Sequence, residues 1–183
     1  MDFEKKLHEI IRVDHAGEFG AKVIYNGQIV ALKLKKDEET LKLVEHMKKQ
    51  EDVHFDYFNE EIKKHKIRPT VLHPVWKLGG FALGFLTAII DKKAAMVCTT
   101  AVEETIDKHY QEQIEFLEKS EQNQVNQINL ENLKNKIQKF RDEELEHRDI
   151  AYENKAAEFS AYTPLSALIK STVKVAITLS KKI

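Results

Sequence analysis

Four glutamates and two histidines occupy positions where the buried faces of long predicted helices call for apolar residues. Followed in steps of three and four residues, each of these faces is apolar except near its middle, where a glutamate interrupts it. In two of the four helices a histidine follows that glutamate by three residues. The six side chains are Glu18, Glu51, His54, Glu103, Glu144 and His147.

Metal binding is the chemistry that fits these residues. A buried carboxylate without a partner is costly, and four that converge in one core also repel one another. Residues i and i+3 share a helix face, so each Glu-x-x-His pair can direct a carboxylate and an imidazole at one cation. Two such pairs, with one glutamate from each of two further helices, form the ligand set of ferritin-like di-iron and di-manganese bundles. Oxygen and imidazole ligands also suit iron or manganese better than softer metals.

The positions of the six residues strengthen this interpretation, because a single Glu-x-x-His pair can arise by chance. The chain contains two similar halves: Glu18 precedes Glu51 and His54, and Glu103 precedes Glu144 and His147. The glutamate-to-glutamate intervals are 33 and 41 residues. A polar tract at Ser120–Asn129, which we interpret as a loop, accommodates the difference.

The elements that must position these residues are long helices. The chain of 183 residues has six glycines and three prolines, and none of them lies between residues 85 and 163. This scarcity of turn residues excludes sandwiches and barrels, and no glycine-rich phosphate loop supports a nucleotide-binding α/β fold. We therefore expect an all-α, ferritin-like four-helix bundle forming one domain over residues 1–183. Its helices are predicted at about 4–35, 37–66, 92–119 and 130–158.

Charge and cysteine content exclude further classes. The net charge of −1 provides no electrostatic basis for binding nucleic acid. Cys98 is the only cysteine, so the chain has no intrachain disulfide and fits a reducing compartment. The N-terminal residues resemble neither a signal peptide nor a transit peptide, which predicts a cytoplasmic or an already processed protein.

Two segments have a different character. Val71–Ile90 is strongly apolar with Lys77 as its only charge, and we expect Pro74 and Gly79–Gly80 to interrupt it. Pro164–Ile183 is predicted to be an amphipathic segment whose charges are all basic. Both suit attachment to a membrane surface or a partner chain without spanning the bilayer.

Three stretches of the sequence together resemble the demethoxyubiquinone hydroxylase family. The first runs from Ile11 to Glu18 (IRVDHAGE) and continues through Gly20 to Tyr25. The second is Ala101–Glu104 (AVEE), followed shortly by His109 and Tyr110. The third is Phe140–His147 (FRDEELEH). The resemblance covers nearly the whole chain, and the family's metal ligands fall on the same six residues that the helix faces selected.

The resemblance implies a monooxygenase of ubiquinone biosynthesis that uses two iron ions, O2 and an electron donor to hydroxylate the ring of a polyprenyl demethoxyubiquinol. By analogy with related di-iron sites, Glu51 and Glu144 would bridge the metals, and Glu18 and Glu103 would be terminal ligands. NADH is a candidate reductant, acting directly or through a reductase. The family also associates the positions of His109 and Tyr110 with the delivery of electrons or protons; a core tyrosine is the alternative for Tyr110.

The resemblance further implies a peripheral membrane protein. It would lie on the cytoplasmic face of a bacterial inner membrane or the matrix face of the mitochondrial one. It leaves open a homo-oligomer and a lipid-binding accessory protein. We expect four apolar side chains to line or cap the route of the isoprenoid tail: Phe81, Leu83, Phe85 and Leu86.

Two other functions remain open at this point. A ferritin-like protein that binds or oxidises iron would use the same ligands but would assemble into a hollow shell, for which the apolar segment at 71–90 is unusual. A metal-free helical membrane adaptor would instead purify without metal and tolerate loss of Glu51.

Overall fold

Helices form all of the regular structure in the computed structural model, which describes residues 3–121 and 127–182. This confirms the predicted all-α class. The α-helices are α1 (Phe3–Lys35), α2 (Glu38–Lys64), α3 (His73–Ile90), α4 (Lys92–Glu121), α5 (Gln127–Glu153) and α6 (Tyr162–Ser180), with a short 3-10 helix at Ala156–Glu158.

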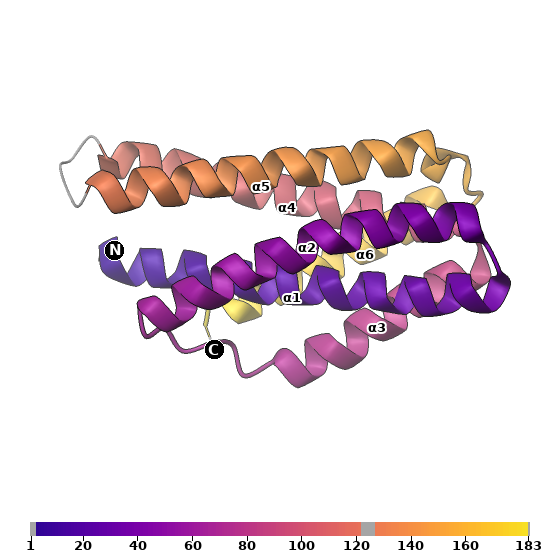
Figure 1. Cartoon of the computed structure of the whole chain (residues 1–183), viewed down its shortest axis with the longest axis horizontal. Helices are drawn as coiled ribbons and strands as arrows, with labels where there is room; N and C mark the ends of the chain where they lie inside the picture. Colours follow the sequence, from indigo (N-terminus) through magenta and orange to yellow (C-terminus); the bar gives the residue numbers. More distant parts are fainter. Residues whose placement is uncertain (1–2, 122–126, 183) are drawn as a thin grey trace.

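The four long helices pair in two layers. Helix α1 packs along α2, and α4 packs along α5, so that the pairs face each other across the core (Figure 1). Helix α3 lies on the outer side of α1, and α6 packs on α4. These positions correspond to the predicted bundle, apolar crossover and C-terminal helix.

Helix boundaries mostly follow local signals, with two exceptions. The side chain of Asp37 caps α2 by accepting a hydrogen bond from the backbone N–H of Thr40 at 3.1 Å. The predicted break at Pro74 and Gly79–Gly80 is wrong: α3 is continuous, because proline is tolerated in the first helical turn and Gly80 packs against α1. The loop predicted at 120–129 is too long, because residues 120–121 belong to α4 and residues 127–129 belong to α5. Residues 122–126 lie outside the described residues.

Two apolar clusters fill the core on either side of its middle. The first joins the start of α1, the end of α2, the second half of α4 and the start of α5; it includes Ile11, Phe58, Leu117, Ile137 and Phe140. The second joins the opposite ends of these helices and includes Leu32, Leu41, Val44, Met47 and Met96. On α2, residues spaced by three and four positions are all buried, as a helix face directed at the core requires: Leu41, Val44, Met47, Glu51, His54, Phe58 and Ile62.

Helix α3 is joined to α1 by an unusually close backbone contact. A Cβ atom added at Gly84 would overlap the backbone carbonyl of Ile24, and one added at Gly27 would overlap the backbone of Phe81. Side chains at these two positions would force the helices apart. Glycine therefore fixes α3 against the helix that carries Glu18.

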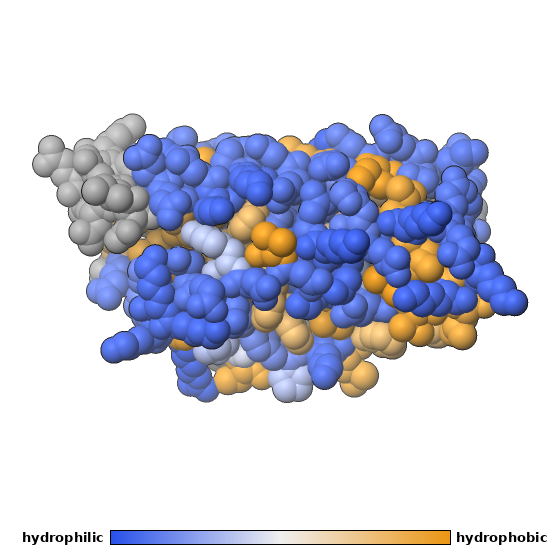
Figure 2. Space-filling model, viewed as in Figure 1, coloured by the Kyte–Doolittle hydropathy of each residue, from blue (hydrophilic) through white to orange (hydrophobic). Residues whose placement is uncertain are grey.

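The opposite side of α3 is exposed and apolar. Figure 2 shows apolar side chains along the lower edge of the molecule, where α3 lies in Figure 1. Among the described residues α3 is the one helix that is long and apolar enough to cross a membrane, judged by length and composition alone. The large exposed apolar side chains of α3 are Val75, Leu78, Phe81, Leu86 and Ile90, and those of α6 are Leu168, Val175 and Leu179.

Substitutions at two glycines of α3 test the close contact. Gly84→Ala is expected to lower the free energy of unfolding by about 1–3 kcal/mol or more, because the backbone of Ile24 cannot give way. Gly79→Ala is the matched control. Its new methyl group meets nothing within 4 Å, so the gain in helix propensity should stabilise the protein by up to about 1 kcal/mol. Urea unfolding followed by circular dichroism measures both, and equal effects would contradict the contact.

Candidate metal centre

The six side chains selected from the sequence converge in the middle of the bundle, between the two apolar clusters. Together they form the carboxylate–histidine cluster, and each is at most 3% exposed. Their ligand atoms form two overlapping groups, and within each group these atoms lie within 4.8 Å of one another. One group is Glu18, Glu51, His54 and Glu144; the other is Glu51, Glu103, Glu144 and His147.

Membership of the two groups gives each glutamate a geometric role. Glu51 and Glu144 belong to both groups, whereas Glu18 and Glu103 each belong to one. This arrangement suits two cations side by side, with two carboxylates between them and one at each end. It supports the bridging and terminal roles that the resemblance implies.

Both histidines turn the same ring nitrogen toward the centre. Nδ1 of His54 lies 3.1 Å from Oε1 of Glu144 and 3.4 Å from Oε2 of Glu18. Nδ1 of His147 lies 3.0 Å from Oε2 of Glu144 and 3.3 Å from Oε1 of Glu51. The Nδ1 atoms are therefore the candidate ligands, and the Nε2 atoms point away from the cluster.

Several carboxylate oxygens of the cluster are buried with no hydrogen-bond partner. Both oxygens of Glu51 and Oε2 of Glu18 and of Glu103 are in this condition. Buried acceptors left without donors are costly in a folded protein. Oxygen and imidazole donors that converge in this way fit a pair of iron or manganese ions, which would supply the missing partners.

The pKa values of these residues in the metal-free protein also indicate a site suited to a bound cation. Burial raises the pKa of Glu51 and Glu103 well above the usual value, and repulsion from neighbouring carboxylates adds to the shift. Burial disfavours charge on Glu144 too, yet hydrogen bonds from His147 and His54 lower its pKa. Burial alone would lower the pKa of His54, but hydrogen bonds to Glu144 and Glu18 raise it to about 12. Without metal the cluster therefore retains protons, which a bound cation must displace.

Two tyrosines contact the terminal glutamates in a crossed arrangement. Tyr25 of α1 donates a hydrogen bond to Oε1 of Glu103 in α4 at 2.9 Å. Tyr110 of α4 donates a hydrogen bond to Oε1 of Glu18 in α1. Each tyrosine lies seven residues after the glutamate of its own helix and bonds to the glutamate of the other. Sequence analysis assigned a role only to Tyr110, although the same spacing marks Tyr25.

Two residues that the sequence pattern did not select contact the outward-facing Nε2 atoms of the histidines. Nε2 of His54 lies 2.7 Å from Oε2 of Glu143, and Nε2 of His147 lies 2.8 Å from Oε1 of Gln50. These contacts keep the rings oriented so that Nδ1 faces the cluster. The available signal was position, since Gln50 and Glu143 directly precede Glu51 and Glu144.

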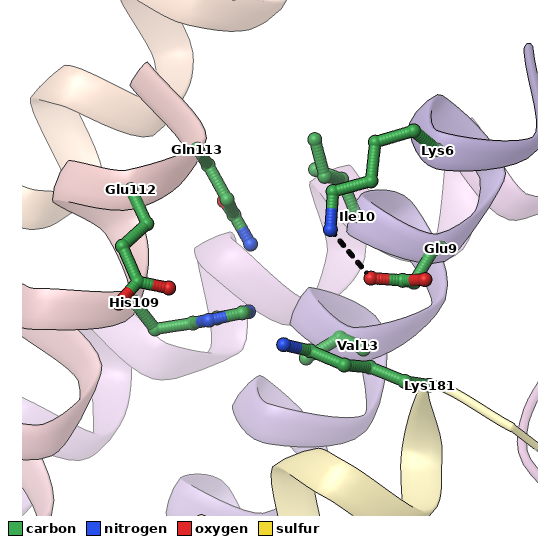
Figure 3. Close-up of a pocket in the computed structure, with 8 residues that line it drawn as sticks. All are labelled: Lys6, Glu9, Ile10, Val13, His109, Glu112, Gln113 and Lys181. Atoms are coloured by element: carbon green, nitrogen blue, oxygen red, sulfur yellow. Dashed lines mark hydrogen bonds and ion pairs between the residues drawn. The ribbon is translucent and has the colours of Figure 1, made fainter. Parts of the chain in front are cut away.

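His109 does not reach the cluster, in contrast to Tyr110. Its Nε2 atom lies 3.9 Å from Oδ1 of the buried Asp14, and Gln113 donates a hydrogen bond to the same oxygen at 2.6 Å. His109 and Gln113 also line a small pocket together with Lys6 and Lys181 (Figure 3). His109 thus lies between this pocket and Asp14. Asp14 is one turn away from Glu18 along α1.

The four apolar residues expected along the tail route divide into two pairs. Phe81 and Leu86 are exposed, at 36% and 54%. Leu83 and Phe85 are partly buried and pack against the core of the bundle. The first pair is therefore more accessible to an outside apolar partner than the second.

The chain is similar to known proteins of one family over nearly its whole length. The profile of the family described as "Ubiquinone biosynthesis protein COQ7" matches residues 5–180. The chain is 42% identical over 177 residues to the "3-demethoxyubiquinol 3-hydroxylase" of Rhodospirillum rubrum, covering 97% of this chain and 78% of that protein. It is 45% and 44% identical, with the same coverage, to the bovine and human proteins named "NADPH-dependent 3-demethoxyubiquinone 3-hydroxylase, mitochondrial".

Ligand substitutions should change the number of bound metal ions in a pattern set by the two groups. Glu18→Ala and Glu103→Ala each damage one group, so each variant should keep one of two ferrous ions. Glu51→Ala removes a ligand from both groups, so it should keep neither tightly. Elemental analysis after anaerobic loading measures the stoichiometry, and circular dichroism confirms folding. Full loading of Glu51→Ala would contradict the assignment.

The metal-free protein should lose stability as the pH rises from 7 to 9. The pKa of His54 rises from 6.5 to about 12 on folding, so across this range the folded state holds a proton that the unfolded chain releases. The raised pKa values of Glu51 and Glu103 act in the same direction. The pKa values of His15 and His109 fall to about 4, which has the opposite effect but only below about pH 6.5. Thermal unfolding measures the trend, and a melting temperature that rises with pH would contradict it.

Proposed function

The chain belongs to the family of the ubiquinone biosynthesis protein COQ7, and on that premise we propose that its carboxylate–histidine cluster holds two iron ions that hydroxylate the ring of a demethoxyubiquinol. The chain is a demethoxyubiquinol hydroxylase of ubiquinone biosynthesis, and hence an oxidoreductase. The observation that carries the proposal is the convergence of four buried glutamates and two histidines in a chain so similar to named hydroxylases over nearly its whole length.

Charge balance supports a pair of divalent ions. Four ionised carboxylates carry four negative charges, which two divalent cations neutralise while both imidazoles stay neutral. A neutral site is far less costly to bury than the four carboxylates alone. The same balance disfavours a metal-free adaptor, since that function gives no reason to bury these groups.

The reaction requires O2 and two electrons besides the quinol. One oxygen atom forms the new ring hydroxyl, and the other leaves as water after taking up two protons and two electrons. Iron ions held by the six residues of the cluster would supply the redox chemistry of O2 activation, with electrons from the donor. The protein holds this chemistry in a core from which the two apolar clusters exclude water.

Tyr110 and His109 are proposed to connect the cluster with the protein surface. The Tyr110 hydroxyl is bonded to Glu18, and burial together with the charge of Glu18 raises its pKa well above the usual value. Tyr110 therefore stays protonated and keeps its hydrogen bond. His109 and Asp14 lie between this bond and the pocket lined by Lys6 and Lys181. We propose that the reductant docks at this pocket; the bovine and human relatives are named NADPH-dependent, which points to a nicotinamide nucleotide.

The exposed apolar face of α3 is proposed to lie on a membrane surface, where a quinol with a polyprenyl tail resides. Its glycine contact with α1 places this face one helix away from Glu18. The relatives are bacterial and mitochondrial proteins, which fits either of the expected membranes. A soluble ferritin-like shell does not require such a face.

A bacterial strain lacking its own demethoxyubiquinol hydroxylase tests the function. The wild-type chain should restore ubiquinone and remove the accumulated demethoxyubiquinone, whereas Glu51→Ala should restore less than about 1% because it leaves no intact metal group. Quinones extracted from the cells and separated by chromatography give the result. Continued accumulation of the precursor with soluble, iron-loaded wild-type protein would refute the proposal.

Vesicle binding tests the membrane face. The double substitution Phe81→Ser and Leu86→Ser should weaken sedimentation with vesicles of phosphatidylcholine and phosphatidylglycerol by roughly ten-fold or more, because it removes two exposed apolar side chains from α3. Val53→Ser is a matched control, since Val53 is 57% exposed but lies on α2. Unchanged binding of a folded double variant would argue against the face.

A further inference from the structure

The two halves of the carboxylate–histidine cluster are related by a crossed pattern that extends beyond the ligands. The residue before each shared glutamate contacts the histidine of the opposite half. Gln50 precedes Glu51 and contacts His147, while Glu143 precedes Glu144 and contacts His54. Each histidine is thus oriented from outside by a residue of the other Glu-x-x-His helix.

These contacts determine which nitrogen of each ring carries hydrogen. The Oε1 atom of Gln50 and the carboxylate of Glu143 are both acceptors, so Nε2 of each histidine donates the hydrogen bond. When a metal ion displaces the proton at the inward Nδ1 atom, this atom offers the ion its lone pair while Nε2 keeps its hydrogen. The two contacts are nearly equal in length: Nε2 of His147 lies 2.8 Å from the Gln50 oxygen, and Nε2 of His54 lies 2.7 Å from the Glu143 oxygen.

The chemistry of the two acceptors is not matched. Gln50 offers a neutral amide oxygen, whereas Glu143 offers a carboxylate that also forms a 3.4 Å ion pair with Lys139. A charged acceptor makes the stronger hydrogen bond and draws the Nε2 proton further from the ring. The imidazole then becomes a more basic ligand at its other nitrogen. His54 is therefore expected to be a better ligand than His147.

The remaining outer contacts do not cancel this difference. Glu18 and Glu103 each accept a hydrogen bond from a tyrosine hydroxyl, so the two terminal ligands are treated alike. Glu51 and Glu144 belong to both groups and favour neither. Among these contacts, the exchange of an amide for a carboxylate is the departure from symmetry that acts on the two histidines.

We infer that the two metal positions are unequal: the position of His54 and Glu18 binds its ion more tightly than the position of His147 and Glu103. Glu143 and Gln50 act as positioning residues that set this order. The inference rests on the proposed metal centre and adds which of its two ions is held firmly and which exchanges.

Variants that keep one position at a time allow the comparison without interaction between two bound ions. Glu103→Ala retains the position of His54, and Glu18→Ala retains the position of His147. Titration of each metal-free protein with Co2+, followed by calorimetry and by visible absorption of the bound ion, gives one dissociation constant per variant. We expect Glu103→Ala to bind Co2+ about ten-fold or more tightly than Glu18→Ala.

Exchange of the outer acceptors then identifies the cause. Adding Glu143→Gln should weaken Co2+ binding about ten-fold in Glu103→Ala and change it little in Glu18→Ala. Adding Gln50→Glu should strengthen binding only in Glu18→Ala. Glu146→Gln, an exposed position on the same helix, is the control for loss of one negative charge. Circular dichroism establishes that each variant is folded.

The possible results separate the inference from the proposed function. Equal Co2+ affinities of the two single-position variants, unaffected by either exchange, would overturn the inference and leave the metal centre intact. An equal effect of Glu146→Gln and Glu143→Gln would also overturn it, because overall charge would then suffice. If the wild-type protein bound no Co2+ at all, the proposed metal centre would fail, and the inference with it.

Discussion

The burial of four carboxylates in one core is the constraint on which the rest of this structure depends. Carboxylates at this depth must be neutralised, and the metal-free protein already shows the strain in the raised pKa values of Glu51 and Glu103. Helices long enough to place apolar clusters on both sides of the site keep it dry. The two histidines then complete a ligand set that fits two divalent ions.

Crossed contacts between the halves hold this charged site in place. Each terminal glutamate is bonded by a tyrosine of the other half, and each histidine is oriented by a residue of the other Glu-x-x-His helix. Each half of the cluster therefore depends on residues of the other half for these hydrogen bonds. The pairing therefore couples the packing of the bundle to the geometry of the ligands, and its single chemical mismatch, Gln50 against Glu143, distinguishes two otherwise similar positions.

The connection between the halves serves a second purpose. Helix α3 packs one side on α1 through glycines and presents the other side as an apolar surface. The buried cluster and this exposed apolar surface thus lie on opposite sides of one helix, α1. In the proposed membrane-bound state, the polyprenyl tail would lie at that surface while the polar cluster stays in the core.

The scarcity of glycine and proline determined the all-α class. The periodicity of the buried helix faces determined all six candidate ligands, because such a face repeats along the chain whatever its neighbours are. Local signals failed at Pro74 and Gly79–Gly80, where α3 is continuous: Pro74 lies in its first turn, and Gly80 packs against α1. Spacing and position single out Tyr25, seven residues after Glu18, and Gln50 and Glu143, which directly precede two ligands. Only the tertiary structure showed which residue of another helix each of them contacts, because spacing within one helix does not record contacts between helices.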